Sequence, residues 1–162
     1  MRSFLATVVG AALAIAALAP TAAAVEPIRE DLSFNDTAVL ADVCPFPVTV
    51  ELTATATETV FFDKEGNVTR IQDHVVEQDV FTANGKTLVG LPFTFNFQVL
   101  IDPETGEATN VFASGVFSRV PLPGGGFFLT AGRADFSGES FLIQPDVGAQ
   151  GNIAGFCAAL AP

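Results

Sequence analysis

VFTANGKTLV, at residues 80–89, is the stretch of this sequence that decides its fold. Asn84 and Gly85 stand between two short runs of residues that favour strands. An Asn-Gly pair in that setting predicts a two-residue type I′ turn, because both central positions of the turn need a positive φ. The stretch therefore predicts a β-hairpin in which Val80 pairs with Val89.

A second turn is predicted upstream, at residues 63–67 (DKEGN), with Gly66 in the left-handed conformation and Asp63 paired with Asn67. Residues that lie directly opposite each other in an antiparallel pair share one face of the sheet. Counting along the strands from the two turns pairs Val60 with Arg70, Glu58 with Gln72, Ala56 with His74, His74 with Phe95 and Gln72 with Phe97. The two turns thus predict a single face for these residues.

A column of polar side chains is predicted on that face. Residues 48–56 alternate Val, Leu and Ala with Thr and Glu, so the Thr side is expected to face water and the other side to be buried. The buried side would carry Glu58, Arg70, Gln72 and His74 beside Phe93, Phe95, Phe97 and Phe112. The same count places Asp73, Glu77 and Asp79 in solvent. A bulge at Gly90 and Pro92 would reverse part of this assignment and turn His74 to solvent.

Three interpretations of the polar column stay open. Glu58 and Arg70 can simply satisfy each other near the rim of the fold, because a buried charge is costly unless it is paired. Alternatively, the polar column and the four phenylalanines form a ligand-binding site. A catalytic role would use His74 or Glu58 as a general acid or base. No G-x-S-x-G motif and no second histidine accompany them, so no catalytic residue is assigned and an enzyme is the less favoured interpretation.

An all-β fold follows from strands predicted near 47–62, 68–83, 87–102, 108–120, 127–136 and 139–144, with Leu32-Ser33-Phe34 as a possible short addition. The 16 phenylalanines supply more apolar bulk than one exposed sheet can hide. An antiparallel up-and-down barrel of about six to eight strands would bury them and remove the sheet edges. A two-layer β-sandwich is the alternative. Asn152 predicts the N-cap of a short C-terminal helix.

Export is predicted by the N-terminus. Residues 1–24 combine Arg2, an apolar run and a small-residue ending at Ala24, which is the pattern of a secretory signal peptide. Residues 25–46 are then an N-terminal lead segment, and residues 47–162 a single β-barrel domain. Cys44 and Cys157 are the two cysteines of the chain. They are expected to form a disulfide bond in an oxidising, extracellular environment.

The charge of the chain limits its partners. A formal net charge of −11 at pH 7 argues against nucleic acid and against an anionic membrane surface as partners. One histidine, no Cys-x-x-Cys motif and no D-x-[DN]-x-[DN]-G loop leave no ligand set for a metal. We therefore expect an acidic extracellular protein that is a monomer and uses no metal or cofactor.

Three segments carry a resemblance to a known group: residues 42–48 (DVCPFPV), 81–93 (FTANGKTLVGLPF) and 131–136 (AGRADF). They resemble uncharacterised small secreted proteins of high-GC Gram-positive bacteria. The resemblance implies export and supplies no catalytic or binding residue. In strand arrangement alone the layout resembles lipocalin-like and allene-oxide-cyclase-like barrels, and a likeness of fold implies no activity.

The sequence thus predicts a secreted protein that binds a small, largely apolar ligand inside a β-barrel. One alternative is a barrel lyase, isomerase or cyclase that uses His74 or Glu58. The other is an extracellular protein-interaction module, whose interior would be filled and whose outer threonine row, Thr49 to Thr59, would contact a partner.

Overall fold

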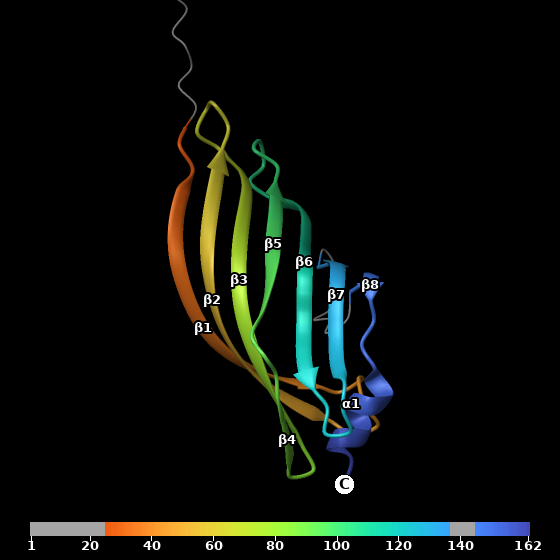
Figure 1. Cartoon of the computed structure of the whole chain (residues 1–162). Coiled ribbons are helices and arrows are strands. Elements are labelled where there is room, and N and C mark those ends of the chain that lie inside the picture. Colours follow the sequence, from red (N-terminus) through yellow and green to blue (C-terminus); the bar gives the residue numbers. More distant parts are fainter. Residues whose placement is uncertain (1–24, 137–144) are drawn as a thin grey trace, which may run out of the picture.

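The computed structural model describes residues 25–136 and 145–162, and within these ranges it contains eight strands and one helix (Figure 1). The elements are β1 (Ile28–Leu40), β2 (Val48–Phe62), β3 (Val68–Ala83), β4 (Lys86–Val89), β5 (Phe93–Ile101), β6 (Ala108–Pro121), β7 (Phe127–Asp135), β8 (Val147–Ala149) and α1 (Ile153–Leu160). The predicted signal peptide, residues 1–24, and the strand predicted at 139–144 lie outside the described residues.

The strands form one antiparallel sheet in the order β1-β2-β3-β5-β6-β7-β8, and β4 pairs with β3 beyond the end of β5. The predicted all-β antiparallel class and the short C-terminal helix are confirmed. The sheet is strongly curved, and β1 and β2 bend beneath the other strands toward α1 (Figure 1). In the described part of the chain the sheet is not closed, because β1 and β8 are its two edges. No helix among the described residues has the length and apolar character needed to span a bilayer.

Strand β1 extends far beyond the short strand expected in the N-terminal lead segment. It pairs with β2 from Ile28 opposite Val60 to Leu40 opposite Val48. Apolar and polar residues alternate only over residues 32–35 (LSFN) of this length, and pairing with the long strand β2 satisfies the backbone hydrogen bonds of the rest. The segment therefore adds a full edge strand to the sheet.

Helix α1 packs on one end of the sheet, on the inside of its curve. Phe156 of the helix is 0% exposed, and its ring centroid lies 5.1 Å from that of Phe81 and 4.7 Å from that of Phe128. Leu160 is likewise 0% exposed in the same core cluster. Burying these side chains removes apolar surface from water, so the helix stabilises the end of the sheet that it covers.

The C-terminal segment is held by the contacts that the sequence predicted. Asn152 is the N-cap, and its side-chain oxygen accepts a hydrogen bond of 2.9 Å from the backbone N–H of Gly155. Cys157 on α1 forms a disulfide with Cys44, with the two Cα atoms 5.5 Å apart. Both predictions are confirmed, and the disulfide joins the helix to the segment between β1 and β2.

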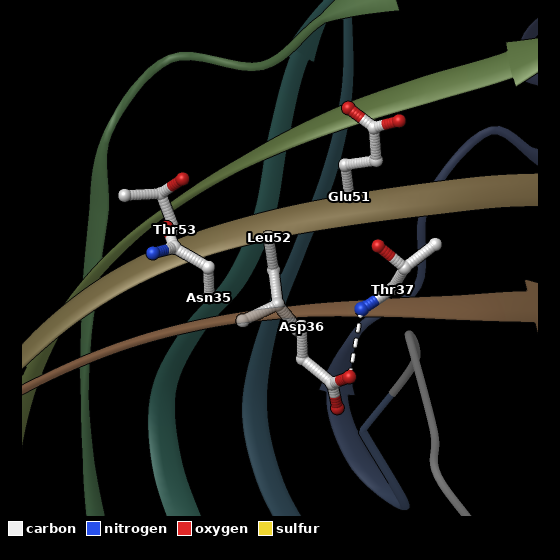
Figure 2. Close-up of a pocket in the computed structure, with 6 residues that line it drawn as sticks. All are labelled: Asn35, Asp36, Thr37, Glu51, Leu52 and Thr53. Atoms are coloured by element: carbon white, nitrogen blue, oxygen red, sulfur yellow. Dashed lines mark hydrogen bonds between the residues drawn. The ribbon is translucent and has the colours of Figure 1, made fainter.

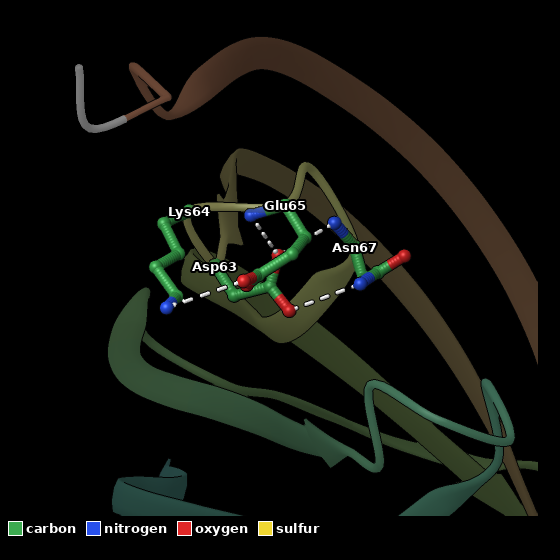
Figure 3. Close-up of polar contacts among 4 residues, drawn as sticks. All are labelled: Asp63, Lys64, Glu65 and Asn67. Atoms are coloured by element: carbon green, nitrogen blue, oxygen red, sulfur yellow. Dashed lines mark hydrogen bonds and ion pairs between the residues drawn. The ribbon is translucent and has the colours of Figure 1, made fainter. Parts of the chain in front are cut away.

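The predicted turn at residues 63–67 is also confirmed (Figure 3). The backbone N–H of Asp63 donates to the carbonyl of Asn67 at 2.9 Å, and Gly66 has a φ of 91°. The Asp63 carboxylate accepts hydrogen bonds from the backbone N–H groups of Glu65 and Asn67 and from the Asn67 amide (2.9, 2.8 and 3.0 Å). The bond from the Asn67 amide is the main cause that lowers the pKa of Asp63. Lys64 and Glu65 add an exposed ion pair of 3.3 Å.

The register predicted beyond this turn is wrong by one residue. Phe62 lies opposite Val68, as the turn requires, but Phe61 lies opposite Arg70. Thr69 is therefore an extra residue on β3, a β-bulge, and its hydroxyl donates to the Phe61 carbonyl at 3.3 Å. A one-residue shift moves every side chain of a strand to the other face relative to its partner.

A one-residue error in the predicted register also occurs between β3 and β5, on the other side of β3. The β3–β4 hairpin forms in the predicted register, and the N–H of Gly90 still donates to the Asp79 carbonyl at 2.8 Å. The N–H of Leu91 instead donates to the carbonyl of Arg119 on β6, also at 2.8 Å. The chain thus leaves β3 for a few residues before β5 begins, which is the bulge foreseen as an alternative at Gly90 and Pro92.

When pairing resumes, Phe93 lies opposite Glu77, and His74 lies opposite Asn96 instead of Phe95. Because β3 is displaced relative to both neighbours, its odd-numbered residues join the apolar faces of β2 and β5. The solvent positions predicted for Asp73, Glu77 and Asp79 are therefore wrong, and His74 is exposed.

Candidate functional site

The inner face of the sheet is the face that packs against α1 at one end and carries Ala54, Val75 and Phe95 further along; the outer face is the opposite one. Side chains of the inner face form rows across the strands. From the end near α1, successive rows contain Ala38, Val50, Phe81 and Leu88; Asp36, Leu52 and Asp79; Phe34, Ala54, Glu77 and Phe93; Leu32, Ala56, Val75 and Phe95; and Glu30, Glu58, Asp73 and Phe97. The inner face therefore mixes apolar and acidic side chains.

A cavity of about 390 Å³ lies on this face, away from the end that α1 covers. Its apolar walls include Leu32, Phe34, Ala56, Val75, Phe95 and Phe97, and three carboxylates line it as well: Asp36, Asp73 and Glu77. Val75 and Ala56 are buried at 4% and 6% exposure, whereas Leu32 and Phe34 of the edge strand are 39% and 43% exposed. The cavity thus has a closed floor on β2 and β3 and an open side along β1.

Aromatic contacts hold the wall formed by β5. The ring centroids of Phe93 and Phe95 lie 6.2 Å apart in a stacked arrangement, and Phe95 lies 6.0 Å from Phe117 of β6. Phe97 lies 5.9 Å from Phe136. Pairs at these separations stabilise one another beyond the area that they bury, so this wall is fixed by neighbouring rings.

Asp73 is a carboxylate in an apolar setting. It lies opposite Glu58 on β2 and opposite Phe97 on β5. Its Oδ1 atom is buried and has no hydrogen-bond partner. Burial raises the pKa of Asp73, and the negative charge of Glu58 raises it further. A carboxylate held in this way favours any group that brings a positive charge or a hydrogen-bond donor.

Glu77 and Asp79 form a second acidic site, one row nearer to α1. Asp79 is only 5% exposed, and its Oδ1 atom is buried without a hydrogen-bond partner. Burial is the main cause that raises the pKa of Asp79 to about 8, and the charge of Glu77 and a hydrogen bond to it act in the same direction. Burial also raises the pKa of Glu77, although the hydrogen bond from Asp79 opposes this.

Basic side chains in the described part of the chain lie away from the cavity. The register places the four arginines on the outer face: Arg29, Arg70, Arg119 and Arg133. Arg70 and Arg133 lie over aromatic rings there, 3.9 Å from the centroid of Phe61 and 4.3 Å from that of Phe112. Lys64 is in the 63–67 turn, and the Lys86 ammonium donates to the carbonyl of Ala161 near the end of α1.

The predicted site residues are divided between the two faces. The inner face carries Glu58, Phe93, Phe95 and Phe97, and the outer face carries Arg70, Gln72, His74 and Phe112. On the outer face the side-chain oxygen of Gln72 accepts a hydrogen bond of 3.4 Å from the Gln98 amide. His74 Nδ1 lies 3.2 Å from Asn96 Oδ1. Of the eight, Phe95 and Phe97 line the cavity. The predicted polar column does not form as one group.

The residues that sequence reasoning missed are the acidic ones. Asp73 and Glu77 alternate with Val75 along β3, a pattern that is equally typical of a solvent-exposed face. The even-numbered face of the same strand contains Val76 and Val80, so hydrophobicity gives no clear choice between the two faces. The feature of the sequence that could have placed Asp73 and Glu77 on the inner face was the possible bulge at Gly90.

A second pocket, of about 450 Å³, lies along the edge strands β1 and β2 (Figure 2). Figure 2 shows Asp36 and Leu52 on one side of this strand pair and Glu51 and Thr53 on the other. The Asp36 carboxylate accepts a hydrogen bond of 2.7 Å from the N–H of Thr37. Asp36 therefore contributes to both pockets and lies at the open side of the inner cavity.

Among the described residues, no group of three or more His, Cys, Asp or Glu side chains is arranged to hold a metal ion. Comparison with protein-family models, with curated proteins and with solved structures found no match.

Proposed function

We propose that the protein is secreted and binds a small, largely apolar molecule in the cavity of the inner face. The cavity itself carries the proposal. Its volume of about 390 Å³ lies in the range of small-molecule sites, and its walls are mostly aliphatic and aromatic with a few polar groups. The disulfide between Cys44 and Cys157 supports export, because such bonds form and persist mainly in oxidising compartments.

The positions of the titratable groups favour binding over catalysis. His74, the residue considered as a general acid or base, is exposed on the outer face beside Asn96. Glu58 lies on the inner face but faces Asp73, another carboxylate. A general acid or base must be within hydrogen-bond reach of the reacting group, and His74 does not line the inner cavity.

Native mass spectrometry of the protein secreted by a bacterial host tests this proposal. We expect a chain that begins at Val25 and carries an added mass that is lost on denaturation. Ala56→Phe should remove the added mass, because the ring would occupy the cavity. Thr55→Phe is the matched control, since Thr55 is an exposed residue of the outer face. Retention of the added mass by Ala56→Phe, or its loss from Thr55→Phe, would contradict the proposal.

A further inference from the structure

The charges around the cavity are distributed unevenly, and this asymmetry bears on what the cavity accepts. The inner face carries the acidic residues Glu30, Asp36, Glu58, Asp73, Glu77 and Asp79. In the described part of the chain the arginines are all on the outer face, and the two lysines are at turns. The acidic groups of the inner face therefore have no arginine beside them on that face.

The carboxylates lie around an apolar floor. Asp73 and Glu77 flank Val75 on β3, each about 7 Å along the strand from it, and Asp36 lies across the cavity on β1. Val75 is 4% exposed between them. Asp73 and Glu77 are about 13 Å apart along the strand, so a molecule that rests on Val75 and on the β5 rings can bring its polar end to one of them.

An uncharged or anionic ligand in the cavity would raise the free energy of these carboxylates. Covering the cavity removes water from Asp73, whose Oδ1 atom already has no hydrogen-bond partner. A carboxylate that loses water without gaining a donor costs free energy, and a second negative charge adds repulsion. An ammonium group supplies both charge and hydrogen-bond donors, and bonds between ionised partners are the stronger ones.

We infer that the cavity takes a cationic amphiphile, a small organic amine whose apolar body contacts Val75, Phe95 and Phe97 and whose ammonium group contacts Asp73, while Glu77 and Asp36 add negative charge elsewhere on the cavity wall. This inference rests on the proposed binding function and deepens it. Burial raises the pKa of Asp73 and that of Glu77, and an ammonium group beside such a carboxyl group would favour its ionised form.

Three probes that each contain eight carbon atoms test the inference by isothermal titration calorimetry at pH 8: octylammonium, octanol and octanoate. We expect octylammonium to bind with a Kd roughly tenfold or more below that of octanol, which is the effect of one good charged contact. Octanoate should bind most weakly. Raising the salt concentration should weaken octylammonium binding and leave octanol binding nearly unchanged.

Charge-removing variants locate the contact. Asp73→Asn should raise the Kd of octylammonium severalfold and leave that of octanol unchanged, and Glu77→Gln should act in the same direction with a smaller effect. Asp36→Asn should also act in this direction and should leave folding intact, because Asp36 is at an exposed position of β1. Glu51→Gln is the control, because Glu51 is exposed on the outer face of β2.

The outcomes separate the two proposals. Equal affinity for octylammonium and octanol, or no response to Asp73→Asn, would overturn the cationic class and leave apolar binding standing. No binding of any of the three probes by the folded, disulfide-bonded protein would overturn the binding function together with the inference.

Discussion

Asp79 lies two residues from Glu77 on the inner face of β3, so two carboxyl groups share one largely buried site. Burial together with the Glu77 charge raises the pKa of Asp79 to about 8. Two neighbouring carboxyl groups in an apolar site tie the properties of the inner face to pH.

The free energy of unfolding should fall as the pH rises from about 4 to about 8 through the contribution of Asp79. Its folded pKa of about 8 lies above the usual aspartate pKa of 3.8, so the folded state binds the proton more tightly. The contribution is complete below pH 4 and is lost as the pH passes through 8. Thermal unfolding followed by circular dichroism should show a higher Tm at pH 5 than at pH 8.5. A Tm that is unchanged or higher at pH 8.5 would contradict this assignment.

Asp79→Asn should stabilise the protein at pH 8.5 by about 1–3 kcal/mol, because a buried carboxylate without full hydrogen bonding is replaced by a neutral amide of similar shape. At pH 5 the variant and the parent should differ little. Urea unfolding at both pH values measures the difference. The exposed Glu51→Gln serves as the control and should show no such pH-dependent gain.

Octylammonium binding should strengthen as the pH rises through the titration of Asp73 and Glu77. Burial raises the pKa of both groups, and their ionisation creates the charge that attracts the ammonium. The other charged groups of the inner face, Glu30 and Asp36 of β1, Glu58 of β2 and Asp79, are acidic as well. Calorimetry in two buffers of different ionisation enthalpy should detect proton release on binding, and proton uptake would be the opposite of what we expect.

Removing the disulfide should destabilise the domain strongly. Cys44 and Cys157 are separated by 113 residues, and loop-closure arithmetic for this length gives about 4–5 kcal/mol as an upper figure. The double variant Cys44→Ser/Cys157→Ser should therefore have a much lower Tm than the parent. A Tm within a few degrees of the parent would show that the bond contributes little.

Truncating Phe156 should cost about 3–5 kcal/mol, since its ring is fully buried between Phe81 and Phe128. Phe127→Ala is the matched control, because Phe127 is 50% exposed and its loss leaves no internal cavity. Chemical unfolding of both variants gives the comparison. Equal destabilisation would mean that α1 is not packed on the sheet as described.

The local elements of this fold were predictable because a few neighbouring residues determine each of them. Asn84 and Gly85 specify a two-residue turn, Gly66 a left-handed turn position, and Asn152 a helix N-cap, and all three occur as expected. The pairing of Cys44 with Cys157 followed from there being only two cysteines. These features need no knowledge of distant strands.

The register was not predictable in the same way. Thr69 is an ordinary strand residue in sequence, and nothing nearby marks it as the extra residue of a bulge. Its insertion exchanges the two faces of β3, and both faces carry apolar residues, Val76 and Val80 on one and Val75 on the other, so the hydrophobic pattern did not reveal the error. As a consequence His74 was predicted inside and Asp73 outside, and the structure reverses both.

The most direct test of the account is an NMR titration of the ¹⁵N-labelled mature protein with octylammonium. Chemical-shift changes should be centred on the inner-face residues Ala56, Asp73, Val75, Glu77 and Phe95, with little change at Thr57, His74 and Asn96 of the outer face. Changes centred on His74 and Asn96, or changes spread evenly over both faces, would contradict the assignment of the binding site to the inner cavity.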